Sequence, residues 1–350
     1  MSSRVDRVKA RIPEGCASLL VTDPVNVRYL TGFSSSNAVL LVDATRVLLL
    51  TDGRYLEAAA SVPGVEVVEA SRDLALDLGS RLQSLGPGPV AFEADQLSVA
   101  RHAKLVPSGV ELVATSGIVE GVRAVKEPGE VDAIRRSAAI LTQAYERLAG
   151  EAVVGRTEAE VAWLLERAMH ELGAEGPAFA TIVASGPNAA LPHHHPGDRI
   201  IAAGEVLLVD AGCLVDGYCS DCTRTFATGL LPDELLAAYA ACRRAQEQSL
   251  AAVRAQADCR AVDGVARALL TDAGYPVMHG LGHGVGLAIH EEPRLADTAT
   301  GALAAGNVVT VEPGVYLPGL GGVRIEDLVA VGHEGVEVLT TFTKELVTLA

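Results

Sequence analysis

Five potential metal-binding side chains, four of them carboxylates, most constrain what this chain of 350 residues can fold into. Each lies within an apolar or glycine-rich segment: Asp210, Asp221, His283, Glu312 and Glu326. Four carboxylates gathered at one point would repel one another strongly unless cations neutralised them. An acid alone in such a segment is as readily explained as a strand-end cap, but the five together favour a site for two divalent ions. Such a site indicates metal-assisted hydrolysis.

The first two carboxylates fall on a predicted β-hairpin. An apolar run that ends at Asp210 and a second run after residue 217 flank the two-residue turn Asp216-Gly217. This turn places Asp210 opposite Thr223 and puts Asp221 one diagonal step away on the same face. Both carboxylates can then reach the same pair of ions.

The other two carboxylates fall on a second predicted hairpin. Residues 308–314 and 322–327 form its strands, and each strand carries one acid, Glu312 or Glu326, in an apolar run. His283 lies among alternating glycines, which let the backbone approach the site closely and leave the imidazole room to bind a metal.

These segments resemble the metal motifs of the pita-bread metallopeptidases, a family that includes methionine aminopeptidase, aminopeptidase P and prolidase. The matching segments are Val209–Gly212, Ser220–Phe226, His279–Gly286, Val311–Gly314 and Val323–Asp327. All five ligand positions match in order and type. Upstream, Val27–Phe33 and Leu50–Tyr55 resemble the extra N-terminal domain of the proline-specific members and of creatinase. The resemblance therefore covers nearly the whole chain and implies action on Xaa-Pro bonds.

The expected fold is α/β (α+β) in two domains, because the chain exceeds the length at which a single core usually stops growing. Residues 1–121 form a small creatinase/prolidase-like α/β domain, and residues 122–350 form the catalytic pita-bread domain. Long helices are predicted at 130–149, 157–172, 232–255 and 259–273. A helix pair thus precedes each hairpin, as the internal pseudo-twofold duplication of the pita-bread fold requires.

Composition limits the partners of the chain. Its formal charge of −16 argues against nucleic acid and anionic membranes, since both need a basic surface. The N-terminal residues contain no continuous apolar stretch, so we expect no signal peptide or membrane anchor and a cytoplasmic protein. The six cysteines are expected to be free thiols, and Cys219 and Cys222 to be packing residues rather than a redox or zinc pair.

Histidines near the metal motifs are candidates for catalysis. By resemblance, His193 holds the position of a substrate-facing histidine in the proline-specific enzymes, although His194 and His195 leave the register open by one residue. A surface metal patch is the alternative reading of this triplet. His290 matches the second catalytic histidine of the family and would steady the oxyanion of the tetrahedral intermediate. His279 is close enough to the metal motif to join the same pocket.

Two arginines complete the predicted site. Arg324 lies two residues before Glu326, on the same face of its strand, where it can orient a carboxylate or a histidine; a solvated strand-edge arginine is the alternative. Arg294 follows His290 in an arrangement similar to that of compact microbial prolidases. It is the candidate to bind the proline carboxylate of a dipeptide.

The resemblance implies that the enzyme hydrolyses Xaa-Pro dipeptides with a metal-bridging hydroxide, while Glu312 carries the proton from the water to the departing proline nitrogen. Xaa-Pro aminopeptidase activity on longer peptides is the alternative, and a metal-free binding module or a creatinase-like chemistry is a third. Oxygen-rich ligands favour Mn²⁺, with Co²⁺ or Zn²⁺ also suitable. The expected partners are small peptides with proline in second position and a second copy of the chain in a homodimer.

Overall fold

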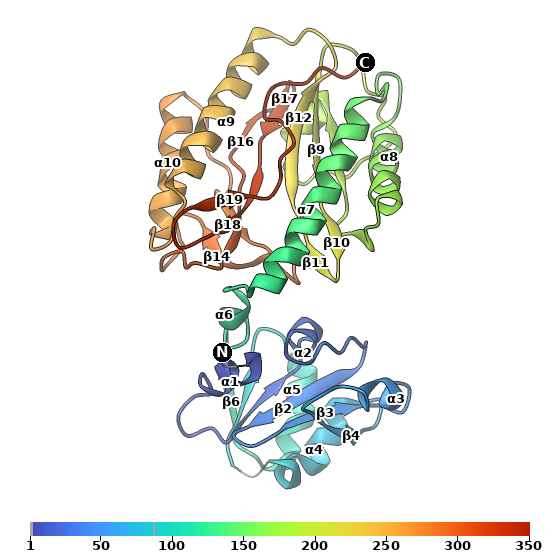
Figure 1. The fold of residues 1–350 in the computed structure, drawn as a ribbon, viewed down its shortest axis with the longest axis vertical. Coiled ribbons are helices and arrows are strands. Elements are labelled where there is room, and N and C mark those ends of the chain that lie inside the picture. Colours follow the sequence, from blue (N-terminus) through green and yellow to red (C-terminus); the bar gives the residue numbers. More distant parts are fainter. Residues whose placement is uncertain (1–2, 87) are drawn as a thin grey trace. The chain divides into compact units, whose positions relative to one another are not determined.

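The computed structural model describes residues 3–86 and 88–350, and the chain divides into two compact units, Met1–Arg123 and Ala124–Ala350 (Figure 1). Each unit contains both helices and strands, so the predicted α/β class is confirmed. None of the helices in the described part of the chain is long and apolar enough to cross a membrane.

A mixed sheet with the strand order β4-β3-β2-β1-β5-β6 forms the centre of the first unit. Its strands are β1 (Ser18–Val21), β2 (Ala38–Asp43), β3 (Val47–Thr51), β4 (Glu66–Glu69), β5 (Val90–Glu93) and β6 (Leu112–Thr115). The helices of the unit are α1 (Arg4–Lys9), α2 (Pro24–Thr31), α3 (Leu56–Ala59), α4 (Leu74–Leu85), α5 (Val99–Leu105) and α6 (Glu120–Arg123), with the 3₁₀ turn η1 (Val106–Ser108). Leucines spaced four apart on α4, Leu74, Leu78 and Leu82, pack in one core with Leu20 and Leu48 from the sheet.

Four long helices of the second unit confirm the predicted helix pairs. They are α7 (Pro128–Ala149), α8 (Glu158–Glu171), α9 (Asp233–Ala252) and α10 (Cys259–Asp272). The Thr157 hydroxyl accepts a hydrogen bond from the Glu160 N–H, and the Glu160 carboxylate accepts one from the Thr157 N–H, so the expected capping box begins α8. Each pair has its own core, one including Tyr145 of α7 and the other Leu270 of α10.

The first hairpin has the predicted register. It consists of β9 (Val206–Ala211), β10 (Cys213–Val215), β11 (Tyr218–Cys219) and β12 (Cys222–Ala227), and β8 (Ile182–Ser185) extends the sheet beside β9. Asp216 and Gly217 have φ of 51° and 71°, as a type I′ turn needs, and Thr223 pairs with Asp210. All six cysteines are free, and Cys219 and Cys222 are buried among apolar side chains, as expected.

The second hairpin is also present, but it is split into two ladders. They are β15 (Val308–Val311) with β18 (Asp327–Val331), and β16 (Gly314–Leu317) with β17 (Gly321–Arg324). Val311 pairs with Asp327 and Gly314 with Arg324, so the register is the same on both sides of the break. Glu312 and Glu326 therefore lie opposite each other in the gap between the ladders.

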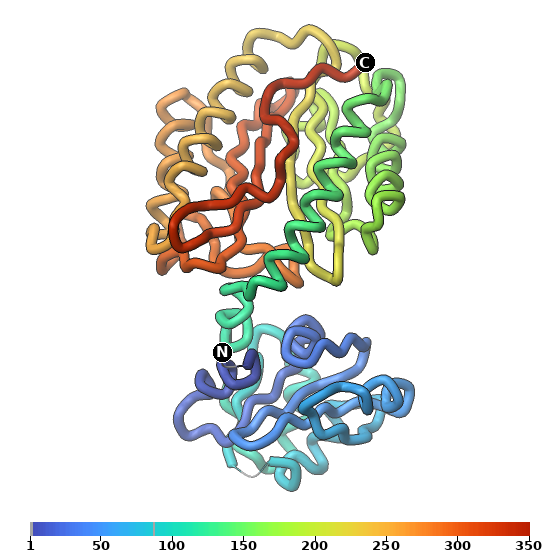
Figure 2. Tube along the Cα trace, viewed as in Figure 1, coloured from blue at the N-terminus to red at the C-terminus, as the bar shows by residue number. Residues whose placement is uncertain are grey.

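Shorter elements complete the second unit: β7 (Gly176–Pro177), the 3₁₀ turn η2 (Gly186–Ala190), β13 (Gly282–Gly284), β14 (Glu291–Leu295) and β19 (Val336–Val338). The tube view shows the C-terminal segment returning to the strands of the first hairpin (Figure 2). There the Ala227 N–H donates to the Val347 carbonyl, and the Val153 N–H donates to the Ala350 carbonyl. The end of the chain thus closes the core beneath α7 and α8.

A pair of glycine substitutions tests the packing at the first hairpin. A Cβ on Gly212 would lie 2.0 Å from the Ser220 carbonyl oxygen, whereas one on Gly264, exposed on α10, would meet nothing within 4 Å. Gly212→Ala should lower the free energy of unfolding by about 2 kcal/mol through overpacking. Gly264→Ala should raise it by up to about 1 kcal/mol. Urea denaturation measures both, and equal effects of the two substitutions would contradict this packing.

Candidate active site

One cavity of the second unit, about 760 Å³ in volume, brings together every side chain that the sequence singled out for the site. Its walls include the five candidate ligands, together with His193, His279, His290, Arg294 and Arg324. These residues come from positions spread over more than a hundred residues of sequence, and the two hairpins supply the four carboxylates and Arg324.

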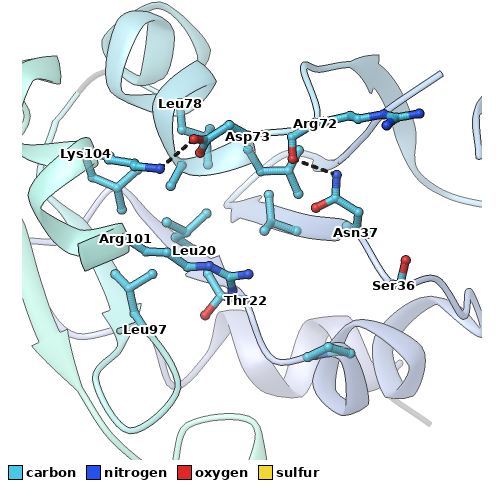
Figure 3. Close-up of a pocket in the computed structure, with 16 residues that line it drawn as sticks. Leu20, Thr22, Ser36, Asn37, Arg72, Asp73, Leu78, Leu97, Arg101 and Lys104 are labelled. Atoms are coloured by element: carbon cyan, nitrogen blue, oxygen red, sulfur yellow. Dashed lines mark hydrogen bonds and ion pairs between the residues drawn. The ribbon is translucent and has the colours of Figure 1, made fainter. Parts of the chain in front are cut away.

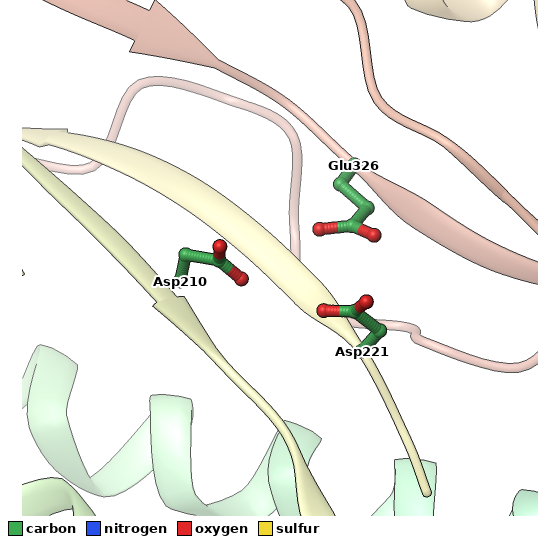
Figure 4. A group of neighbouring side chains, drawn as sticks. All are labelled: Asp210, Asp221 and Glu326. Atoms are coloured by element: carbon green, nitrogen blue, oxygen red, sulfur yellow. The ribbon is translucent and has the colours of Figure 1, made fainter. Parts of the chain in front are cut away.

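Three carboxylates form the deepest part of this cavity. Asp210 is the second-last residue of β9, Asp221 precedes β12, and Glu326 lies between β17 and β18. Their side chains point toward one another (Figure 4). One oxygen of each carboxylate lies within 4.8 Å of an oxygen of the other two. Such an arrangement offers several oxygen ligands to a divalent cation at one point.

The three carboxylates of this trio disfavour one another's negative charge. Burial raises the pKa of Asp210, and burial together with the neighbouring carboxylates raises the pKa of Asp221 and Glu326 well above the ordinary values. Asp210 Oδ1 and Glu326 Oε1 are buried and have no hydrogen-bond donor. Orphaned acceptors among mutually repelling acids fit a site that binds divalent cations.

His283 and Glu312 form a second group beside the trio. The His283 ring donates from Nδ1 to the Gly284 carbonyl at 3.0 Å, which leaves Nε2 facing Glu312 Oε1 at 3.2 Å and Asp221 Oδ2 at 3.7 Å. Burial raises the pKa of Glu312, but the hydrogen bond and charge of His283 outweigh it and lower this pKa to about 2. Burial lowers the pKa of His283, but the hydrogen bond and charge of Glu312 raise it by more, so the net shift of this pKa is upward. His283 Nε2 therefore faces Glu312 and one carboxylate of the trio at once.

Arg324 connects the trio to the far wall of the cavity. Its Nη2 donates to Asp210 Oδ2 at 2.7 Å and its Nη1 to the Tyr316 hydroxyl at 3.0 Å. His279 donates from Nδ1 to the Gly280 carbonyl. Its Nε2 therefore accepts a hydrogen bond from the Tyr316 hydroxyl at 2.9 Å. Arg324 is buried in this network, so the alternative of a solvated strand-edge arginine is wrong.

Tyr316 and Thr223 are site residues that the sequence interpretation missed. Thr223 donates its hydroxyl to Glu326 Oε2 at 2.8 Å and accepts from Arg324 Nε at 3.1 Å. Its position opposite Asp210 in the predicted register could have identified Thr223 as a neighbour of the ligands. Tyr316 gave no such signal, because its partners are set by where the split hairpin lies.

His290 lies beside His283 at the edge of the candidate ligands. Its ring centroid is 4.4 Å from that of His283, and the two rings meet edge to face. Burial, and then the charge of His283, lower the pKa of His290, so its imidazole is neutral near pH 7. The following residue, Glu291, forms a buried ion pair with Lys126 at 2.9 Å, which fixes the loop that carries His290.

The three consecutive histidines have different surroundings. His194 Nε2 lies 2.7 Å from Glu158 Oε2, so this ring is already engaged by a buried carboxylate. His193 and His195 are exposed on the cavity wall. Arg294 also lines the cavity, with 70% of its side chain exposed and its Nε 3.6 Å from Glu292 Oε1. Its guanidinium is therefore accessible to a small ligand.

The first unit contains a cavity of about 460 Å³ with a different character (Figure 3). Leucines such as Leu20, Leu78 and Leu97 line it, and Lys104 at its edge is paired with Asp73 at 2.5 Å. Within residues 3–86 and 88–350, only the trio of the second unit brings three or more acids, histidines or cysteines close enough to share a metal. Metal chemistry therefore belongs to the second unit.

Comparison with known proteins agrees with this geometry. Residues 132–333 match the model of metallopeptidase family M24, and residues 4–125 match the creatinase/prolidase N-terminal domain. The chain thus has the fold and site of a metallopeptidase with an added N-terminal domain. It belongs to metallopeptidase family M24, as its resemblance to the pita-bread enzymes predicted.

Several relatives resemble the chain over its whole length. A Xaa-Pro dipeptidase of Pyrococcus furiosus is 32% identical and covers 99% of this chain and 100% of its own. The structure of a Xaa-Pro dipeptidase from Bacillus anthracis has a TM-score of 0.95 at 35% identity, covering 99% of both chains. An X-Pro aminopeptidase from Thermotoga maritima has a TM-score of 0.88 at 32% identity, covering 98% of this chain and 100% of its own. These matches confirm the predicted fold.

Neutralising one buried acid should stabilise the metal-free protein. A carboxyl whose pKa is raised by folding contributes stability below its ordinary pKa near 4 and loses it as the pH rises through the folded value. With metal removed by a chelator, Asp221→Asn or Glu326→Gln should therefore raise the free energy of unfolding at pH 7 by on the order of 1–3 kcal/mol. The gain should disappear near pH 4.

Denaturation in the presence and absence of Mn²⁺ measures this effect. The same variants should lose the stabilisation that Mn²⁺ gives to the unsubstituted protein. Asp95→Asn, at an exposed position of the first unit, is the matched control and should change neither quantity. Variants that destabilise the chelated protein at pH 7 would contradict the electrostatic account of the trio.

Proposed function

We propose that this chain is a Xaa-Pro dipeptidase that depends on two divalent metal ions. The observation that carries the proposal is the convergence of four carboxylates and His283 in one cavity of a family M24 chain. Support for the substrate comes from the relatives, two of which are named as Xaa-Pro dipeptidases. The site supplies what hydrolysis of such a peptide bond requires: anionic ligands, a proton acceptor, and hydrogen-bond donors for the developing oxyanion.

The proposed ligands are Asp210, Asp221, His283, Glu312 and Glu326. These residues would hold two divalent cations, whose charge would make water a nucleophile near neutral pH and would polarise the scissile carbonyl. Mn²⁺ is the favoured ion because oxygen atoms outnumber nitrogen in this set, and Co²⁺ or Zn²⁺ is also compatible. Arg324 holds Asp210 in place through the bond to Oδ2 and so orients this carboxylate within the ligand group.

The side chains around these ligands have separate roles in proton transfer, oxyanion stabilisation and substrate orientation. Glu312 accepts the proton from water at a carboxylate oxygen and passes it to the proline nitrogen as the peptide bond breaks. Neutral His290, next to His283, donates a hydrogen bond to the carbonyl oxygen as negative charge develops on it. His193, on the same cavity wall, orients the substrate. Tyr316, which is itself hydrogen-bonded to His279, helps to hold Arg324 in place.

Recognition of a dipeptide requires a cation near its C-terminal carboxylate, and Arg294 is the proposed group. Its exposed guanidinium at the cavity wall is free to make a charged hydrogen bond to that carboxylate. An Xaa-Pro aminopeptidase would leave this end of the pocket open to longer peptides. That second candidate rests on the similarity to the X-Pro aminopeptidase of Thermotoga maritima.

We further propose that the enzyme is a homodimer, as the resemblance implies, and that it acts in the cytoplasm. Small peptides with proline in second position are the expected ligands, and nucleic acid and membranes are not expected partners. Analytical ultracentrifugation of the metal-loaded protein distinguishes a dimer from a monomer.

Removal of a proposed ligand should abolish hydrolysis. Asp221→Ala or Glu312→Ala should lower kcat/KM for Xaa-Pro dipeptides by at least about a thousandfold, because the cations that activate water are lost or displaced. Elemental analysis should show less bound Mn²⁺ in both variants. Asp272→Ala, at the exposed end of α10, is the control and should keep full activity. A fully active variant at either proposed ligand would refute its assignment.

The choice between dipeptidase and aminopeptidase can be tested at Arg294. Arg294→Ala should raise KM for Xaa-Pro dipeptides by about tenfold, the usual effect of losing a hydrogen bond to a charged group, and change KM for Xaa-Pro-Yaa tripeptides little. Arg260→Ala, exposed on α10, is the matched control. Release of proline from paired dipeptide and tripeptide substrates measures the difference. Equal effects on both substrates would remove the carboxylate-binding role.

A further inference from the structure

The segment that presents His193 to the cavity is tied to a buried acid on a different element. Glu158 is the first residue of α8, and its side chain is 0% exposed. Although burial raises the pKa of Glu158, hydrogen bonds from Ser185 and His194 outweigh it and lower this pKa below the ordinary value. The carboxylate is therefore ionised and acts only as an acceptor.

Every hydrogen bond to this carboxylate comes from the segment 185–197. The Ser185 N–H and hydroxyl donate to Oε1 at 2.8 and 2.7 Å, and the Asn188 amide lies 3.0 and 3.2 Å from the two oxygens. The His194 ring donates from Nε2 to Oε2 at 2.7 Å, and the Gly197 N–H approaches Oε2 at 3.4 Å. The buried carboxylate of Glu158 thus holds both ends and the middle of the segment by hydrogen bonds.

The main chain adds to this connection. The Glu158 N–H donates to the Arg199 carbonyl and the Ala159 N–H to the Gly197 carbonyl, each at 3.1 Å. These two N–H groups belong to the first turn of α8, which has no partner for them within the helix. The segment and the start of α8 therefore satisfy each other's polar groups.

His193 lies between two fixed points of this segment. On one side the Pro192 carbonyl accepts a hydrogen bond from Arg324 Nη1 at 3.3 Å, and on the other the His194 ring is held by Glu158. The bond from Arg324 ties the segment to the ligand group, and the bond to Glu158 ties it to the framework. The Cα of His193 then has little freedom to move.

We propose that Glu158, acting through His194, is a positioning residue that fixes His193 in the active site. This inference rests on the proposed role of His193, and it adds a residue for which neither the sequence nor the family resemblance indicated a role. Glu158 does not touch the substrate. Fixing His193 should increase the rate, because a displacement of about 1 Å in a substrate-orienting group can cost about a hundredfold in rate.

Substitutions at Glu158 and His194 test the proposal on the metal-loaded full chain. Glu158→Gln keeps the size of the side chain but leaves one acceptor for donors that needed two oxygens. It should lower kcat for an Xaa-Pro dipeptide by about 10- to 100-fold. His194→Leu should have the same effect, whereas His194→Gln, whose amide nitrogen can replace Nε2, should restore activity to within about threefold of the unsubstituted enzyme.

Glu160→Gln is the matched control on the same helix. Glu160 is exposed and completes the capping box with Thr157, so this change removes a negative charge from the start of α8, keeps an oxygen that can accept the capping bond, and does not touch the segment 185–197. Its kcat should stay within about twofold of the unsubstituted enzyme, since a capping bond affects stability by only about 1 kcal/mol. A loss equal to that of Glu158→Gln would reduce the role of Glu158 to helix stability and overturn the proposal.

A double-mutant cycle separates positioning from general destabilisation. If Glu158 acts through His193, Glu158→Gln should add less than about threefold to the loss already caused by His193→Ala. If the loss of kcat in the double variant equalled the product of the two single losses, the residues would act independently and the proposal would be overturned.

Amide hydrogen exchange provides a readout that does not depend on catalysis. The amides of residues 186–197 should exchange faster in Glu158→Gln and His194→Leu but not in Glu160→Gln. Unchanged exchange would refute the anchoring itself, and faster exchange with unchanged kcat would refute its effect on catalysis. A fully active His193→Ala would instead remove the role that the proposed function gives to His193, while the exchange result would still decide whether Glu158 anchors the segment.

Discussion

The second unit is organised around the mutual repulsion of its buried carboxylates. Burying ionised acids together is costly unless opposite charge is brought close, and the raised pKa values of Asp221 and Glu326 reflect that cost. Arg324 provides part of the compensation through Asp210, and the His283 imidazole provides part through its contact with Glu312. The remaining deficit is what two divalent cations would supply. Folding thus prepares a site whose electrostatic balance is completed by metal.

The split hairpins are the structural means of burying these acids. The ladder is interrupted at Asp221 in the first hairpin, between the β9/β12 and β10/β11 pairings, and at Glu312 and Glu326 in the second, so these side chains can turn toward one point. Pro313 follows Glu312 and has no N–H for a ladder bond, which explains why the second ladder stops there. Gly212 has a related role in the first hairpin, where the Ser220 carbonyl leaves no room for a side chain.

Much of this arrangement could be predicted from local sequence. The turn Asp216-Gly217 fixes the register of the first hairpin, and the capping box at Thr157 fixes the start of α8, because both depend on neighbours within a few residues. The break in the second hairpin, the contact of Tyr316 with Arg324, and the hold of Glu158 on His194 could not be predicted. Each depends on which distant segments the fold brings together, and a buried glutamate at a helix start has no distinctive local pattern. The roles proposed for the site residues remain predictions.

The proposed chemistry depends most directly on two cations lying among the five proposed ligands. Anomalous diffraction from crystals grown with Mn²⁺ would locate them without reference to activity. Two peaks are expected inside the cavity, bounded by the trio of Asp210, Asp221 and Glu326 on one side and by His283 and Glu312 on the other. An absence of peaks there at saturating Mn²⁺, or peaks confined to other parts of the molecule, would contradict it.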